Sequence, residues 1–162
     1  MYLFFHLFVG LILGLILSRL RPDFLIILLC MFMSLLPDLL DKPMSLMFPE
    51  LNSGRTFGHT LCFVLLIVII SWDQYKLQVL GAGSAIFLHQ VFDSMWNSPT
   101  TWFYPIFGPF LMSTWVGATG NWFWSVFLLE VTSPVEWVAG IGSVLILILL
   151  QLSKPEVRNV TE

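Results

Sequence analysis

Long apolar runs separated by short polar connections dominate this sequence, and they restrict its fold more than any other feature. Hydrophobic residues make up 57% of the 162 residues, whereas charged residues make up only 10%. Soluble domains carry roughly 25% charged residues, so a water-soluble fold of this composition would expose a large apolar surface. In a bilayer, every backbone polar group must be paired internally, which makes helices the natural form of such runs. The sequence therefore predicts an all-α, polytopic integral membrane bundle.

About five apolar runs are candidate transmembrane helices of a single domain, residues 1–152, which a short polar tail, residues 153–162, follows. The runs are Tyr2–Leu17, Phe24–Leu36, Phe57–Trp72, Leu77–Trp96 and Val135–Leu152. Several are shorter than the ~20 residues that cross a bilayer as a helix. Because the short runs end in ionisable residues, we expect them to end in a polar cavity rather than to thin the membrane.

Two connections contain many residues that interrupt helices. Leu39–Thr56 holds two prolines and a glycine and is predicted to be a loop. Asn97–Asn121 combines three prolines with the aromatic stretch from Trp102 to Phe110. Proline breaks a spanning helix, and aromatic side chains concentrate at headgroup depth. We therefore expect Asn97–Asn121 to be an interfacial or re-entrant segment.

The distribution of positive charge predicts an orientation. If all five runs span, one face of the membrane receives Arg19, Arg21, Lys76, Lys154 and Arg158. Cytoplasmic loops carry an excess of lysine and arginine, so that face should be cytoplasmic. Because Arg19 and Arg21 follow the first run instead of preceding it, that run is expected to be an uncleaved helix and not a signal peptide. The protein is thus predicted to be multi-pass in the inner or plasma membrane.

All three histidines and three aspartates fall at the predicted non-cytoplasmic ends of these runs. The set is His6, Asp38, Asp41, His59, His89 and Asp93. His89 and Asp93 are four residues apart and share a helix face, and ionisable residues at membrane depth are costly enough to indicate function. Imidazole and carboxylate together suit zinc, manganese or iron, and carboxylates alone suit magnesium or calcium. We predict a site for one or two divalent ions, with zinc as first choice and manganese or magnesium as alternatives.

Short motifs around these residues carry a resemblance to a known family. They are His6–Gly10, Leu35–Pro43, Arg55–Thr60, and His89–Asp93 followed by Ser98, Pro99 and Pro105. Over roughly residues 1–110 they resemble the YdjM-like membrane-bound metal-dependent hydrolases, some of which are described as LexA-regulated. The chain differs from that pattern in several places. Asp38 and Asp41 are three residues apart instead of two, Gly58 and Thr60 stand where the family has threonine and serine, and Gly54 stands where many members have another histidine.

The resemblance implies hydrolysis, and the residues indicate a substrate class. Arginine pairs bidentately with oxyanions, so Arg55 next to a metal suits a phosphate. A site at membrane depth with aromatic residues above it suits an amphiphile. We therefore expect a lipid-linked phosphoester, cleaved by metal-activated water, with Arg55 stabilising the developing charge. Asp41 is expected to be either a metal ligand or the general base.

Two other functional classes stay open, and one partner class is excluded. Transporters also bury histidine and aspartate, so a proton- or ion-coupled transporter is one alternative. A structural or regulatory member of the family without catalytic activity is the other. The net charge is −3 and basic residues do not cluster, so nucleic acid is not expected as a partner. The expected partners are the lipid bilayer and the amphiphilic substrate.

Overall fold

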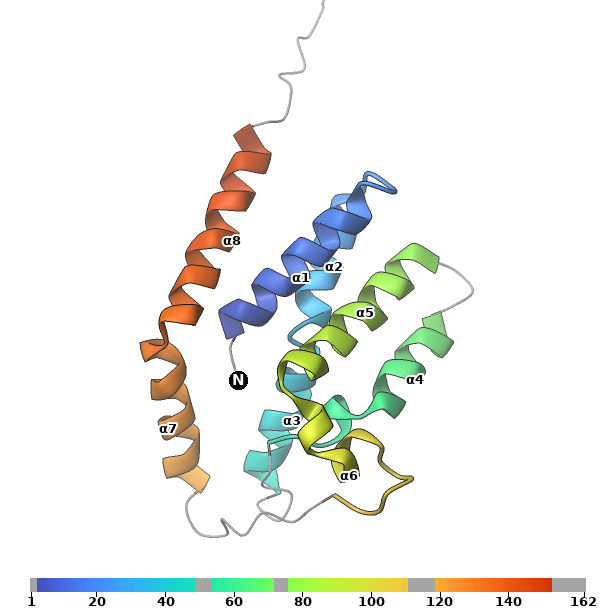
Figure 1. Cartoon of the computed structure of the whole chain (residues 1–162), viewed down its shortest axis with the longest axis vertical. Coiled ribbons are helices and arrows are strands. Elements are labelled where there is room, and N and C mark those ends of the chain that lie inside the picture. Colours follow the sequence, from blue (N-terminus) through green and yellow to red (C-terminus); the bar gives the residue numbers. More distant parts are fainter. Residues whose placement is uncertain (1–2, 49–53, 72–75, 111–118, 153–162) are drawn as a thin grey trace, which may run out of the picture.

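The computed structural model describes residues 3–48, 54–71, 76–110 and 119–152, and all regular elements within these ranges are helical. The α-helices are α1 (Leu3–Ser18), α2 (Phe24–Met33), α3 (Leu36–Met47), α4 (Leu61–Ser71), α5 (Lys76–Phe92), α6 (Pro99–Trp102), α7 (Thr119–Thr132) and α8 (Pro134–Leu152). Two 3-10 turns, η2 (Phe57–His59) and η3 (Met95–Asn97), flank α4 and α5 on the same side. The all-α prediction is confirmed, and α3, η2 and α6 gather at one end of the longer helices (Figure 1).

Two helical stretches are long and apolar enough to cross a membrane. They are Phe24–Ser45, which contains α2 and most of α3, and Pro134–Leu152, which is α8. The apolar stretches Leu3–Ser18 and Leu61–Ile70 are shorter. The predicted arrangement of about five spans therefore stays a prediction.

The helical region around Pro37 extends further than the sequence indicated. Leu39–Thr56 was expected to be a loop, but α3 continues to Met47, so that prediction is wrong for the first half of the segment. Pro37 lies in the first turn of α3, where a missing N–H costs nothing, and Asp38 in the same turn complements the positive end of the helix dipole. Residues 49–53 lie outside the described part of the chain.

Glycines let α1 lie directly against α2. A Cβ atom on Gly10 would lie 2.6 Å from the carbonyl oxygen of Cys30, and one on Gly14 would lie 2.6 Å from the Cα atom of Ile27. Small residues four apart permit this close backbone approach between membrane helices. The contact fixes α2, and therefore the start of α3, relative to the N-terminal helix.

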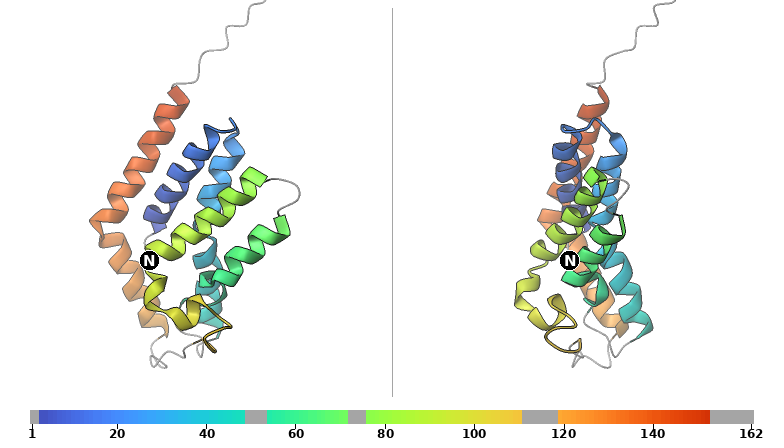
Figure 2. Two further views of the ribbon diagram at one scale, coloured as in Figure 1. Left: turned by 45° about the vertical axis from the view of Figure 1, so that its right-hand side comes forward. Right: turned by 90° about the vertical axis from the view of Figure 1, so that its right-hand side faces the viewer.

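The C-terminal helix α8 packs along the outer side of α1 (Figure 2). Glu136 at its start is 2% exposed, and its Oε2 accepts a hydrogen bond of 2.6 Å from the backbone N–H of Phe4. This carboxylate pairs one of the free N–H groups at the beginning of α1. Gly140 then lets the ring of Phe4 approach α8 closely.

Apolar side chains lie mainly on the outside of the molecule. Residues that are more than half exposed include Ile16, Leu25, Ile69, Val138 and Leu149, which belong to four different helices. Among the described residues, the buried side chains are more often polar or charged than apolar. An apolar exterior around a polar interior is the pattern expected of a chain surrounded by lipid.

The aromatic connection consists of η3, the short helix α6 and a series of turns up to Phe110. Tyr104 stacks on Phe110 with ring centroids 4.2 Å apart, and both rings contact Phe57 edge-on. Residues 111–118 of the predicted re-entrant segment, and the predicted polar tail 153–162, lie outside the described residues. An interfacial position for this segment stays a prediction.

Candidate metal centre

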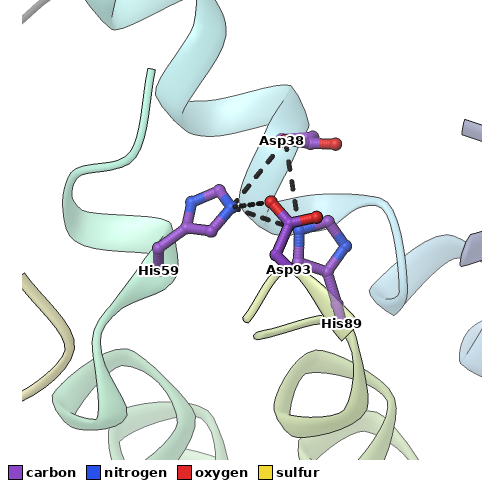
Figure 3. Close-up of side chains that lie close together, drawn as sticks. All are labelled: Asp38, His59, His89 and Asp93. Carbon is purple, nitrogen blue, oxygen red and sulfur yellow. Dashed lines mark hydrogen bonds and ion pairs between the residues drawn. The ribbon is translucent and has the colours of Figure 1, made fainter. Parts of the chain in front are cut away.

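Four buried side chains from three parts of the chain converge at the end of the bundle. Asp38 comes from the first turn of α3, His59 from η2, His89 from the last turn of α5, and Asp93 from the residue after α5. One ligand atom from each lies within 4.8 Å of the others, and their side chains point toward a common centre (Figure 3). The sequence predicted these four as ligands, and the fold brings them together.

The spacing of the four groups matches the size of a single divalent ion. The Nε2 atoms of His59 and His89 are 3.2 Å apart. Asp38 Oδ1 lies 3.8 Å and 4.0 Å from these two nitrogens, and Asp93 Oδ2 lies 3.6 Å from the first. Metal–nitrogen bonds of about 2.0–2.1 Å in tetrahedral geometry place ligand atoms roughly 3.3 Å apart. Two imidazole nitrogens and two carboxylates suit zinc, manganese or iron.

A backbone carbonyl fixes the orientation of His89. Its Nδ1 lies 2.7 Å from the carbonyl oxygen of Ser34, in the break between α2 and α3. A carbonyl oxygen only accepts hydrogen bonds, so Nδ1 carries the proton and Nε2 presents its lone pair to the centre. Histidine ligands of metals are usually held in this way.

Asp41 lies behind His59 and outside the four-residue cluster. Its Oδ2 accepts hydrogen bonds from His59 Nδ1 at 2.7 Å and from the backbone N–H of Thr56 at 2.6 Å. Its Oδ1 accepts from the Thr56 hydroxyl at 2.8 Å and from the N–H of Gly58 at 2.9 Å. The structure places Asp41, fully buried, where it orients His59 Nε2 toward the centre, and its predicted role as a ligand or general base stays a prediction.

The close approach around Asp41 accounts for Gly58, which is one of the departures from the family pattern. A Cβ atom on Gly58 would lie 2.8 Å from both Cα and O of Pro37, and 3.2 Å from Asp41 Oδ1. A larger residue would push η2 away from α3. The glycine therefore allows the hydrogen bond between its own N–H and Asp41, which is part of the support of His59.

The surroundings of His59 favour its charged form in the protein without metal. Burial lowers the pKa of the imidazole, but hydrogen bonds to Asp41 and Asp93 and the charge of Asp38 outweigh it and raise the pKa above its usual value. His59 lies outside both candidate spans. A positive charge is thus favourable at this position, which is the electrostatic condition that a bound cation requires.

His6 contacts the cluster from α1 without belonging to it. Its Nε2 lies 3.2 Å from Asp93 Oδ1, and its ring lies over that of His89 with centroids 4.0 Å apart. His6 is buried, and its Nδ1 has no hydrogen-bond partner among the described residues. The geometry therefore supports His6 as an orienting partner of Asp93, whereas its predicted role as a ligand stays a prediction.

Each carboxylate of the cluster is paired with one cationic side chain. Arg55 Nη2 lies 3.1 Å from Asp93 Oδ2, and Lys42 Nζ lies 2.9 Å from Asp38 Oδ2. The Arg55 side chain is 36% exposed and Lys42 is 14% exposed. Arg55, predicted as a catalytic residue, thus lies at the edge of the cluster. Lys42 also lies at its edge, although it is not among the residues predicted for the site.

Gln90 connects the elements that carry the ligands, and it is also not among the residues predicted for the site from the sequence. Its side-chain N–H groups donate to the carbonyls of Gly58 and Thr60, each at 3.0 Å, and its Oε1 accepts from Trp102 Nε1 at 2.9 Å. The residue is fully buried, so its polar atoms need these partners. A glutamine directly after His89 in an apolar helix was the available signal.

Comparison with known proteins agrees with the sequence motifs. A model of the YdjM inner membrane protein family matches residues 1–156. No curated protein and no solved structure gives a match. The match covers nearly the entire chain and includes all residues of the cluster. The chain therefore belongs to the YdjM inner membrane protein family.

Proposed function

We propose that the chain is a membrane-embedded, metal-dependent hydrolase. The observation that carries the proposal is the buried cluster of Asp38, His59, His89 and Asp93, in which two histidine Nε2 atoms approach to 3.2 Å. At this distance the two nitrogens share either a proton, which a charged His59 supplies, or a metal ion. The hydrogen bonds of Ser34 and Asp41 orient both nitrogens toward the centre.

The residues around the cluster suit attack on a phosphoester. A divalent cation held there would lower the pKa of a water molecule and polarise the bond to be cleaved. Arg55, partly exposed at the rim, is placed to bind an oxygen of the substrate and to stabilise charge that develops on it. Asp41 is saturated with hydrogen bonds, so we assign it the positioning of His59 in preference to proton transfer.

The surroundings of the site favour a lipid-linked substrate. The helices that carry the ligands expose apolar side chains, and an inner membrane location follows from the family. An amphiphile can place its apolar part among these helices and its phosphate at the cluster. Zinc is the first choice of metal, with manganese and magnesium as alternatives.

We further propose that α1, α2 with α3, α4, α5 and α8 all cross the membrane and that the site faces the non-cytoplasmic side. The turn between α1 and α2, the start of α5 and the end of α8 lie at the end of the molecule opposite α3 and α6 (Figure 1). Arg19, Arg21 and Lys76 belong to that opposite end and are exposed. Positive residues mark the cytoplasmic face.

Metal analysis of the purified protein tests the proposal. We expect stoichiometric zinc or manganese by mass spectrometry, and its loss in His89→Ala. Gln78→Ala is the matched control, because Gln78 lies on the same helix α5 far from the cluster. A folded wild-type protein that binds no divalent metal would exclude the hydrolase, and pH-driven flux in proteoliposomes would then favour the transporter.

A phosphate-release assay tests the reaction itself. Lipid phosphates in mixed micelles are incubated with the metal-loaded protein, and we expect phosphate release that Arg55→Gln and His89→Ala abolish. Stoichiometric metal without release from any lipid phosphate would instead favour a family member that has no catalytic activity.

A further inference from the structure

Lys42 occupies an unusual position for a lysine in this molecule. It lies one turn after Asp38 on α3, with its Nζ 2.9 Å from Asp38 Oδ2 and its side chain only 14% exposed. The Nζ atom itself is buried from solvent. An ammonium group has three N–H donors, and among the described residues Nζ makes this ion pair with Asp38 but no hydrogen bond. Burying these donors is costly unless an acceptor reaches them.

Lys42 and Arg55 balance the charge of the two cluster carboxylates. Lys42 pairs with Asp38 and Arg55 with Asp93, so these four side chains together are neutral. Asp41 contributes one further negative charge behind His59. A divalent cation would therefore leave the centre with net positive charge, and an anion is the ligand that completes it.

We propose that Lys42 is a substrate-binding residue and that, together with Arg55, it makes the site selective for phosphomonoesters over phosphodiesters. This inference rests on the proposed metal-dependent hydrolase. A monoester has three terminal oxygens, and three positive groups would lie at or beside the cluster: the cation, Lys42 next to Asp38, and Arg55 next to Asp93. A diester has two terminal oxygens, so one of these three groups has no substrate oxygen to bind. Charge-assisted hydrogen bonds to each oxygen supply the discrimination.

Binding of two small anions to the full-length, Mn²⁺-loaded protein tests the inference without relying on turnover. Phenylphosphonate has three terminal oxygens and diethyl phosphate has two. By isothermal titration calorimetry in detergent, we expect phenylphosphonate to bind at least about tenfold more tightly, the effect of one charge-assisted hydrogen bond. Lys42→Gln should remove most of this difference, and Lys42→Arg should keep it. Lys76→Gln, which removes an exposed lysine at the start of α5, is the matched control.

The affinity for Mn²⁺ is measured for each variant, because it separates two roles for Lys42. If Lys42→Gln weakens Mn²⁺ and phenylphosphonate in proportion, the lysine acts only through Asp38 and the inference is overturned. Equal binding of the two anions by the wild-type protein also overturns it, while the hydrolase proposal stands. If the wild-type protein binds neither Mn²⁺ nor any other divalent metal, both the inference on Lys42 and the hydrolase proposal are excluded.

Discussion

Four hydrogen bonds to one carboxylate determine how firmly His59 is held. Asp41 accepts from a ring nitrogen, a hydroxyl and two backbone N–H groups, and it is 0% exposed. An asparagine of the same shape has one oxygen and one NH₂ group, so at least one donor would face another donor. The support of His59, and not the ligand set itself, is what this position contributes.

We therefore expect Asp41→Asn to weaken metal binding by about 10- to 100-fold while leaving a measurable site, as loss of an outer hydrogen-bond partner does. Competition with a chelating dye measures the affinity. Asp23→Asn is the control, because Asp23 caps α2 and asparagine caps helices equally well. Complete loss of the metal would show that Asp41 is a ligand, as the sequence suggested. Unchanged affinity would show that Asp41 contributes only to packing and not to metal binding.

The ligands were recognisable in the sequence, but most of their supporting partners were not. Histidine and aspartate inside apolar runs are costly, so His89 and Asp93 stand out without knowledge of the fold. The acceptor of His89 is a backbone carbonyl, which every residue possesses, so nothing identified Ser34. Lys42 lies in a segment predicted to be a loop because Pro43 and Pro49 interrupt it, and its pairing with Asp38 depends on α3 being helical.

Between helices, the contact of α1 with α2 controls where the cluster forms. Gly10 and Gly14 bring the two backbones together, and α2 leads directly into the break at Ser34 and into α3. The apolar runs predicted the existence of these helices. The end of α2 and the extent of α3 depend on contacts with η2 and α5, which lie far away in sequence.

We expect Gly10→Ala to lower the stability of the protein by about 1–3 kcal/mol, because the added Cβ would lie 2.6 Å from the Cys30 carbonyl oxygen. Gly142→Ala on α8 is the control, since its Cβ would meet Phe8 at an ordinary 3.4 Å. Thermal unfolding in detergent measures both. Equal midpoints for the two variants would mean that α1 and α2 separate readily, in conflict with the packing described.

For the whole molecule, the orientation in the membrane decides which molecules can reach the cluster. A site on the non-cytoplasmic face would meet amphiphiles of the outer leaflet, and one on the cytoplasmic face would meet those of the inner leaflet. The match to an inner membrane family gives the compartment, whereas positive charge alone predicts the side.

Labelling of single cysteines in spheroplasts with a membrane-impermeant maleimide tests this orientation. In a background with Cys30→Ala and Cys62→Ser, we expect Ile106→Cys, which lies 75% exposed after α6, to react without permeabilisation. Arg21→Cys, in the turn between α1 and α2, should react only after the membrane is permeabilised. The reverse labelling pattern would place the site on the cytoplasmic face. Reaction of both cysteines without permeabilisation would show that fewer helices cross the membrane.

The break between α2 and α3 has a consequence for how the protein tolerates change. In a continuous helix the carbonyl of Ser34 would accept from an amide one turn later, but here it holds the ring of His89. A substitution that made the helix continuous at this point would direct the Ser34 carbonyl into a hydrogen bond within the helix and away from His89. The cluster could thus lose its geometry with all four of its side chains intact, so sensitive positions in a mutational scan need not carry a ligand atom.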